Sequence, residues 1–385
     1  MYKYRLLTPG PVAVPERVRR AMSQELIHHR TPEFQSVFRE VREKLQRVFQ
    51  TRQDVLLLAS SGTGAMEAAV ANLLAPGERV VVVRGGKFGE RWAELCEGFG
   101  VQAVCVDVEW GQAVQPAQVR AALDATPDAR AVLVQASETS TGVLHPVREL
   151  AEIVHEQPER MLLVDGISAV GVHDLPMDEW DLDAVVSGSQ KAWRLPPGLA
   201  FVALSARAQQ RLGHVGQPRY YFDLAKELEG QARAHTAYTP AVSLILGLRA
   251  ALDMMLEDGL PELFARQACL ARVVREAVQA LGLALFAPDA PSFACTAVRL
   301  PTGVDGDALV RRLRDVYGVH ISGGQGKVAG KIIRIGHLGD VDGFDMLTLI
   351  AALEMALLDL GYPAKLGEGT RTATQLLREH SIGGG

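Results

Sequence analysis

The sequence predicts an α/β protein in which a mainly parallel sheet, flanked by helices on both faces, is followed by a smaller C-terminal α+β domain. The first observation is that short runs in the first half of the chain are apolar throughout and alternate with helical patterns. Strands that are buried on both faces and joined by helices are typical of parallel sheets. The second observation is that the pattern becomes mainly helical after residue 239, with further strand-like runs between helices.

The N-terminal part begins with a Thr-Pro-Gly-Pro turn at residues 8–11 and continues with helical patterns at residues 16–25 and 32–50. The longer pattern is amphipathic, and its apolar positions at helical spacing are Phe34, Val37, Phe38, Val41, Leu45 and Val48. We expect residues 1–20 to join the smaller domain and residues 21–258 to form the large one.

The large domain contains most of the predicted strands. Strand-like runs occupy residues 55–59, 79–83, 101–106, 131–136, 161–164, 184–186 and 199–204. Helical patterns separate the early ones and occupy residues 64–74, 88–98, 116–123 and 147–155. This alternation is the basis for predicting helical crossovers between parallel strands.

The smaller domain is predicted to cover residues 259–362. After helical patterns at residues 239–256 and 261–283, strand-like runs at 294–300 and 331–335 alternate with helical patterns at 305–317 and 344–360. Residues 363–385 are polar and end in three glycines, so we expect them to form a frayed tail.

Composition favours an enzyme acting on small molecules. The 385 residues are 48% hydrophobic and carry a net charge of −5 with both signs interspersed, which gives no basic field for nucleic acid or an anionic membrane. We find no run that resembles a signal sequence or is long enough to cross a bilayer, so we expect a cytoplasmic protein. The four cysteines are scattered without zinc or redox spacing, and no metal site is expected.

Lys191 is the first candidate for chemistry. It follows the buried strand-like run 183–187 in the stretch Ser-Gly-Ser-Gln-Lys-Ala-Trp, and a Leu-Pro-Pro-Gly break comes after it. Partial burial at the end of a strand favours the neutral amine, which can attack a carbonyl and form a Schiff base. The alternative is an ordinary solvated loop lysine.

Two further stretches favour a chemical role for Lys191 over that of a solvated loop lysine. Small residues at 59–65, Ala-Ser-Ser-Gly-Thr-Gly-Ala, lead from a strand into a helix, and backbone N–H groups at a helix start favour a phosphate. Asp165 ends the apolar run 161–165, at the strand end where open α/β sheets place their ligands. Taken singly, the turn at residues 59–65 can be a tight connection without a ligand, and Asp165 can be an N-cap residue for the turn that follows it.

Together, a phosphate turn, a strand-end aspartate and a strand-end lysine fit one cofactor. Pyridoxal 5′-phosphate needs an anchor for its phosphate, a carboxylate that keeps its ring nitrogen protonated, and a lysine for its aldehyde. The sequence therefore predicts a pyridoxal-phosphate enzyme.

The same stretches, with Glu138-Thr-Ser-Thr-Gly-Val-Leu-x-Pro146 and Arg334-Ile-Gly-x-Leu-Gly, resemble the class V aminotransferases of pyridoxal-phosphate fold type I. The likeness extends from residue 8 to about residue 360 and is greatest to the alanine–glyoxylate and serine–glyoxylate (serine–pyruvate) aminotransferases. It implies transfer of an amino group from a small L-amino acid, alanine or serine, to a 2-oxo acid such as glyoxylate or pyruvate. Which donor is used stays open at this point, because pockets discriminate such small differences weakly.

The resemblance also implies roles for individual residues. Lys191 becomes the Schiff-base lysine and proton shuttle, Asp165 the partner of the ring nitrogen, and Arg334 the arginine that forks onto the substrate carboxylate. The remaining residues implied at the cofactor are Ser61, Gly62, Thr63 and Gln190 for the phosphate and Thr139 near the phenolic oxygen. For Arg334 the alternative is a surface arginine on a strand.

Departures from the family pattern concern the cofactor pocket. Thr63 stands where well-known members have histidine, and Phe88 where they have tryptophan; phenylalanine can still stack on the cofactor ring. Members of the family complete the phosphate site across a dimer interface, so we expect a homodimer. The corresponding region contains Thr236, Tyr238 and Thr239, and the sequence does not decide among them.

Three rival interpretations each lack a feature that they require. A cysteine desulfurase needs a cysteine on a mobile loop, but residues 321–327 contain none and Cys295 lies in an apolar run. A regulator that binds the cofactor without turnover needs a DNA-reading module, for which no length is available before residue 8. A nicotinamide dehydrogenase needs Gly-x-Gly-x-x-Gly after its first strand, which is absent.

Overall fold

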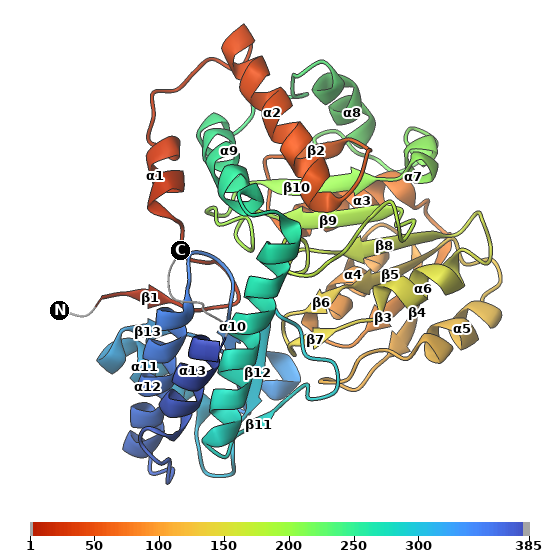
Figure 1. Cartoon of the computed structure of the whole chain (residues 1–385). Helices are drawn as coiled ribbons and strands as arrows, with labels where there is room; N and C mark the ends of the chain where they lie inside the picture. Colours follow the sequence, from red (N-terminus) through yellow and green to blue (C-terminus); the bar gives the residue numbers. More distant parts are fainter. Residues whose placement is uncertain (1–2, 380–385) are drawn as a thin grey trace.

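The computed structural model describes residues 3–379 and places a seven-stranded sheet at the centre of its larger part (Figure 1). The strands, in spatial order, are β2 (Val55–Leu58), β10 (Ala200–Leu204), β9 (Ala184–Gly188), β8 (Met161–Asp165), β5 (Ala131–Gln135), β3 (Arg79–Arg84) and β4 (Gln102–Asp107). Only β10 is antiparallel to its neighbours, so the predicted mainly parallel sheet is confirmed. We call this sheet and its helices the large domain.

Helices cover both faces of the large sheet. They are α2 (Pro32–Phe49), α3 (Gly62–Leu73), α4 (Lys87–Gly98), α5 (Pro116–Asp124), α6 (Val147–Val154), α7 (Ala206–Arg211), α8 (Leu224–Ala232) and α9 (Val242–Leu256), and α1 (Glu16–Met22) packs outside them against α9. Strand β2 shows how the faces divide: Val55 and Leu57 pack in the core cluster with α2 and α9, whereas Leu56 and Leu58 pack in the cluster with α3. Because side chains alternate across a strand, a strand covered on both faces is apolar throughout.

The small domain is built on a four-stranded antiparallel sheet. Its order is β11 (Ala284–Leu285), β12 (Cys295–Arg299), β15 (Ile332–Gly336) and β14 (Ser322–Gly323). The helices around it are α10 (Leu260–Ala280), α11 (Gly306–Tyr317) and α12 (Gly343–Asp359), with the short 3-10 helix η1 (Gly326–Val328). Figure 1 shows α10 extending from beside the large sheet down along the small domain.

The N-terminal segment lies against the small domain before it reaches the large one. Strand β1 (Arg5–Leu6) pairs in parallel with β13 (Val319–His320), and Leu7 is buried in the small-domain core. The backbone N–H of Gly336 donates to the Leu7 carbonyl at 2.7 Å. Residues 8–11 then follow the end of β15 toward the large sheet.

The expectation of a frayed tail from residue 363 is wrong for part of that segment. Residues 368–379 form helix α13 (Glu368–Glu379), which packs in the small-domain core through Ala373, Leu376 and Leu377. These three residues lie at helical spacing on one face, and most other positions are polar. A segment that is polar on average therefore forms an amphipathic helix. The final glycines, residues 383–385, lie outside the described residues.

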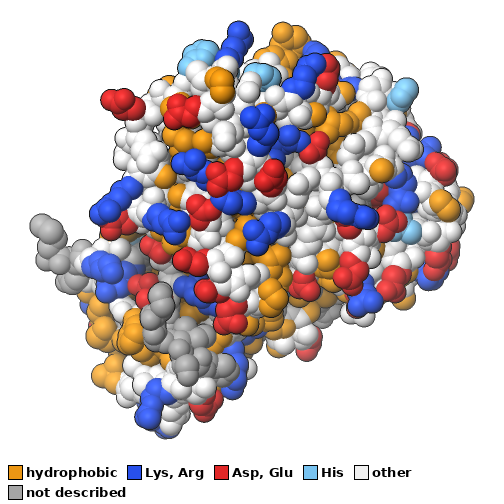
Figure 2. All heavy atoms as spheres, turned by 45° about the horizontal axis from the view of Figure 1, so that its top comes forward, with side chains coloured by type: hydrophobic (Ala, Val, Ile, Leu, Met, Phe, Trp, Pro, Cys, Tyr) orange, Lys and Arg blue, Asp and Glu red, His pale blue; other side chains and the backbone are white. Residues whose placement is uncertain are grey.

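The molecular surface mixes charges of both signs. Figure 2 shows Lys and Arg side chains interspersed with Asp and Glu over one face of the molecule. Within residues 3–379, none of the helices combines the length and the apolar character that crossing a bilayer requires.

Candidate active site

Lys191 is a buried amine at the junction of the two domains. It follows β9 by three residues, is 9% exposed, and donates from Nζ to the Pro9 carbonyl at 2.7 Å. A Cβ on Gly10, which has φ +135°, would lie 2.4 Å from Nζ, so only glycine lets the N-terminal segment approach the lysine. Burial lowers the Lys191 pKa to about 8, which makes the neutral amine accessible near physiological pH. The alternative of a solvated loop lysine is excluded.

Asp165 lies on the neighbouring strand and is also buried. It ends β8, which runs parallel to β9, and its Oδ1 accepts from the Ile167 N–H at 2.8 Å. Burial raises the Asp165 pKa to about 7, against the effect of that hydrogen bond, and the nearby Glu138 carboxylate raises it further. Asp165 also caps the turn that follows β8, because its Oδ1 accepts from the Ile167 N–H and the Ala169 N–H closes that turn on the Gly166 carbonyl; the capping alternative therefore holds for Oδ1. A buried carboxylate in this setting favours a cationic partner.

The turn after β2 presents the start of α3. Ser61 is the N-cap residue, but its side chain caps no N–H group of the helix. The first N–H groups of a helix have no intrahelical acceptors, and the helix dipole favours an anion there. A Cβ on Gly188 would lie 3.1 Å from both the Gly62 nitrogen and Gln190 Oε1, so a larger residue there would push against the start of α3.

Two side chains near the turn add to its affinity for an anion. Gln190 Oε1 is buried and has no hydrogen-bond partner within residues 3–379, which leaves its amide group free to rearrange around a ligand. Arg91 donates from Nη1 to Thr63 Oγ1 at 3.1 Å and brings a positive charge to the turn. The turn, Gln190 and Arg91 therefore fit the phosphate of the predicted cofactor.

Phe88 and Thr139 approach this region from different elements. Phe88 lies half-buried in the first turn of α4, with the Arg91 guanidinium 5.0 Å from its ring centre. Thr139 is buried in the loop between the short strands β6 (Ser137–Glu138) and β7 (Val143–Leu144), and its Oγ1 donates to Ser168 Oγ at 2.8 Å.

Arg334 connects the small domain to the Thr139 loop. It lies on β15, is 6% exposed, and donates from Nε to the Gly323 carbonyl at 2.9 Å and from Nη1 to the Thr139 carbonyl at 3.1 Å. Its Nη2 has no hydrogen-bond partner in the described part of the chain, so the outer edge of the guanidinium is free for a ligand. Burial lowers the Arg334 pKa, which stays far above neutrality because guanidinium is intrinsically so basic. The alternative of a surface strand arginine is excluded.

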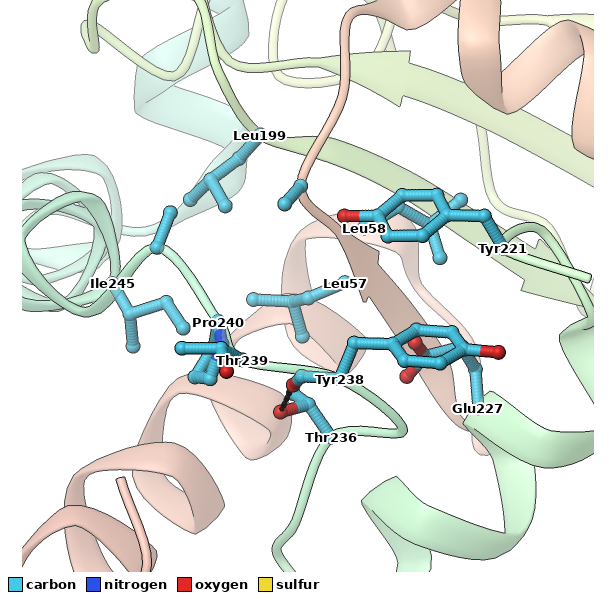
Figure 3. A pocket seen from close by; sticks show the side chains of 12 residues that line it. Leu57, Leu58, Leu199, Tyr221, Glu227, Thr236, Tyr238, Thr239, Pro240 and Ile245 are labelled. Atoms are coloured by element: carbon cyan, nitrogen blue, oxygen red, sulfur yellow. Dashed lines mark hydrogen bonds between the residues drawn. The ribbon is translucent and has the colours of Figure 1, made fainter. Parts of the chain in front are cut away.

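Thr236, Tyr238 and Thr239 lie apart from this group. Figure 3 shows them around a small pocket beside Leu57 and Tyr221. Thr236 Oγ1 donates to the Tyr238 carbonyl at 2.5 Å, and the Tyr221 and Tyr238 rings stack with centres 5.2 Å apart. Among the described contacts of a single chain, none joins these residues to Lys191. Ala59 also lines the pocket, two residues before Ser61.

Sequence reasoning missed two charged residues of the site. Arg91 lies one helical turn after Phe88, and this spacing was the available signal. Glu138 is fully buried between α4 and the Thr139 loop, and only a three-dimensional contact reveals it. Within residues 3–379, no group of three or more His, Cys, Asp or Glu is arranged to hold a metal ion.

Comparison with known proteins places these observations in a family. A family model described as aminotransferase class-V matches residues 9–336. One curated relative, the "soluble hydrogenase 42 kDa subunit" of Anabaena cylindrica, is 40% identical over 363 residues, covering 94% of both chains. Another, the L-aspartate–glyoxylate aminotransferase of Paracoccus denitrificans, is 38% identical over 380 residues, covering 97% of this chain and 96% of the relative.

A solved aminotransferase structure also superposes on this chain. The alanine–glyoxylate aminotransferase of a Nostoc species superposes with a TM-score of 0.88 at 30% sequence identity. The match covers 93% of this chain and 96% of that structure, so it includes both domains.

Proposed function

The chain belongs to the class V aminotransferases, which are pyridoxal-phosphate-dependent transaminases, and we propose that it transfers the amino group of a small L-amino acid to glyoxylate. Two of the aminotransferases that this chain resembles share glyoxylate as acceptor but differ in donor, one being named for L-aspartate and the other for alanine. Alanine and serine, the donors inferred from the sequence, are therefore joined by aspartate as a candidate.

The observation that carries the proposal is the convergence of Lys191, Asp165 and the turn at residues 61–63. Asp165 ends β8, Lys191 comes three residues after the parallel neighbour β9, and Gly188 at the end of β9 packs against Gly62 of the turn. We assign the phosphate to the turn and Gln190. The bound cofactor supplies a pyridinium ring that accepts electrons when the substrate loses its Cα proton.

The protein's own groups account for the remaining steps. We assign Lys191 to hold the cofactor covalently and then to carry the proton to and from the substrate Cα, because its pKa of about 8 lets it accept and release protons near neutral pH. Asp165 is buried and forms no ion pair within residues 3–379, and we assign it to hold the ring nitrogen protonated. Arg334 is assigned to the substrate carboxylate through the free edge of its guanidinium.

A homodimer is part of the proposal. Tyr220 and Tyr221 are 72% and 46% exposed beside Tyr238, which makes an aromatic surface next to the strand that leads into the phosphate turn. Exposed aromatic clusters of this kind mark interaction sites. We assign Thr236, Tyr238 and Thr239 to the phosphate site of a second copy of the chain.

A sulfur-transferring activity is less well supported. Burial raises the Cys295 pKa to about 11, and its Sγ lies 3.7 Å from the Thr139 carbonyl. A protonated, fully buried thiol is a poor nucleophile and cannot reach outside the pocket.

The test is a panel of amino donors assayed with purified protein reconstituted with pyridoxal phosphate. L-aspartate, L-alanine and L-serine are each paired with glyoxylate and with pyruvate, and the cofactor absorbance is followed during each half-reaction. We expect at least one donor to convert the cofactor to its amino form and glyoxylate to restore it. Absence of any conversion, with cofactor bound, would contradict the proposed function.

A further inference from the structure

Helix α4 is capped by side chains from a different part of the chain. Its N-cap residue, Gly86, provides no side-chain cap. The N–H groups of the first helical residues nevertheless have acceptors: Lys87 donates to Ser140 Oγ at 3.0 Å, and Phe88 and Gly89 donate to Glu138 Oε2 at 3.1 and 3.0 Å. The start of the helix is therefore attached to the loop that contains Thr139.

Both oxygens of the Glu138 carboxylate are engaged. Oε1 accepts from the backbone N–H and the hydroxyl of Ser140, while Oε2 accepts from the two N–H groups of α4. Only an ionised carboxylate can accept from four donors without presenting a proton to one of them. Burial raises the Glu138 pKa, and the four hydrogen bonds oppose this. The positive end of the α4 dipole also favours the ionised form.

The contact is too close to tolerate a side chain at residue 86. A Cβ on Gly86 would lie 2.3 Å from Glu138 Cδ and 2.5 Å from Ser140 Oγ. The glycine therefore allows the helix backbone to reach the carboxylate directly. This arrangement needs three coordinated residue choices: glycine at 86, glutamate at 138 and serine at 140.

Groups of the proposed active site lie on both sides of this contact. Phe88, which we place against the cofactor ring, is held by its own N–H to Glu138. Thr139 stands between Glu138 and Ser140 in the chain, and its carbonyl accepts from Arg334 Nη1. The carboxylate thus connects the cofactor-stacking residue with the loop that receives the substrate-binding arginine.

We propose that Glu138 is a positioning residue that sets Phe88 and Thr139 at a fixed separation around the cofactor. The inference rests on the proposed function, since it uses the contacts of Phe88 and Thr139 with the cofactor that the family resemblance implies. Removing the carboxylate should let α4 and the Thr139 loop move relative to each other. The cofactor would then be held less tightly and in an altered environment.

A matched control exists in the small domain. Glu354 is also buried, at 3% exposure, and also accepts from backbone N–H groups at a helix start, from Gly367 at 2.8 Å and Thr370 at 2.9 Å. It belongs to α12 and caps the start of α13, and none of its described hydrogen bonds involves a residue of the proposed site. Glu354→Gln therefore removes the same kind of cap without touching the proposed site.

The experiment compares wild type, Glu138→Gln and Glu354→Gln by thermal unfolding, by titration of apoprotein with pyridoxal phosphate, and by visible circular dichroism of the bound cofactor. Both variants should lower Tm, because each places an amide N–H₂ against backbone donors. Only Glu138→Gln should weaken cofactor binding, by at least about tenfold, and change the visible dichroism band.

A wild-type affinity and a wild-type dichroism spectrum in Glu138→Gln would show that Glu138 is only a structural cap, and would overturn the inference. If Glu138→Gln does not fold, Ser140→Ala replaces it, because it removes one acceptor and one donor while keeping the carboxylate. Ser140→Ala should then produce a smaller change in the same dichroism band, and an unchanged band would overturn the inference. Failure of the wild type to bind the cofactor at all would instead contradict the proposed function.

Discussion

At the scale of single residues, burial moves the two central groups of the site in directions that suit their chemistry. Lys191 becomes a weaker base and Asp165 a weaker acid, because removal from water disfavours the charged form of each. Their strand-end positions could be predicted from the sequence, since an apolar run that stops at a charged residue marks the edge of a parallel sheet. Glu138 could not, because its function depends on a contact with α4, which is distant in the chain.

The assignment of Arg334 leads to a prediction about substrate affinity. Arg334→Lys keeps a positive charge but loses the paired donors that match a carboxylate, so every α-amino and α-keto acid should bind more weakly by about 2 kcal/mol, or roughly thirtyfold. KM values measured donor by donor check this. Selectivity among donors should hardly change, because all share the α-carboxylate. Loss confined to one donor would place Arg334 at the substrate side chain instead.

Two buried histidines hold the loop between β11 and β12, which contacts the large domain. His173 Nε2 accepts from the Phe293 N–H at 3.1 Å, and His337 Nδ1 donates to the Phe293 carbonyl at 3.0 Å. Burial lowers the pKa of both histidines to about 3. They are therefore neutral in the folded protein, and protonating His173 would place a proton against an N–H donor.

These histidines should make stability depend on pH. Their folded-state pKa lies below the unfolded value of about 6.5, so the unfolded chain binds more protons, and the free energy of unfolding falls as pH drops below about 6.5. Each histidine contributes a slope of about 1.4 kcal/mol per pH unit between its two pKa values. When the free energy of unfolding is measured with denaturant between about pH 6 and 4.5, its slope against pH should be smaller in His337→Asn than in the wild type. The difference should be about 1.4 kcal/mol per pH unit, which corresponds to one bound proton. His214→Asn, at an exposed position, is the control, and equal slopes in wild type and His337→Asn would refute the assignment.

At the scale of elements, the apolar runs and helical patterns predicted the strands of the large sheet and the long helices. They did not predict α7, α8 and α13. Helices α7 and α8 are short and depend on N-caps, in which Ser205 accepts from the Ala208 N–H and Asp223 from the Ala225 N–H, so their hydrophobic periodicity is weak. Helix α13 is predominantly polar and has a narrow apolar face. It is stabilised by packing that face against α10 and α12, which the local sequence does not reveal.

The packing of α13 leads to a stability prediction. Leu377 is 8% exposed in the small-domain core, whereas Leu366, in the connection before α13, is 65% exposed. Leu377→Ala should lower the free energy of unfolding by about 2 to 4 kcal/mol, because it removes buried apolar contacts and leaves a cavity. Leu366→Ala should change it by less than about 0.5 kcal/mol. Equal effects in denaturant unfolding would mean that α13 does not contribute to the core.

At the scale of the whole molecule, the site is assembled from segments that the chain brings together over long distances. Pro9, Lys191 and Arg334 come from the N-terminal segment, the large domain and the small domain, respectively. The sequence predicted Lys191 from its position after a buried strand and Arg334 from the family resemblance, and it did not predict that Pro9 contacts the lysine. Such contacts depend on how the two domains pack, which local patterns do not encode.

The proposed dimer couples assembly to cofactor binding. If Thr236, Tyr238 and Thr239 complete the phosphate site of a second copy, separating the subunits removes part of each site. Diluting the protein, which favours separated subunits, should therefore lower the affinity for the cofactor. Tyr220→Asp introduces charge into the exposed aromatic surface beside Tyr238 and should give a monomer that loses pyridoxal phosphate. Light scattering and cofactor absorbance on the same samples measure both effects. Phe344→Asp, at a residue 62% exposed on α12, is the matched control and should leave both unchanged. A Tyr220→Asp monomer that retains cofactor and full activity would show that each chain carries a complete site.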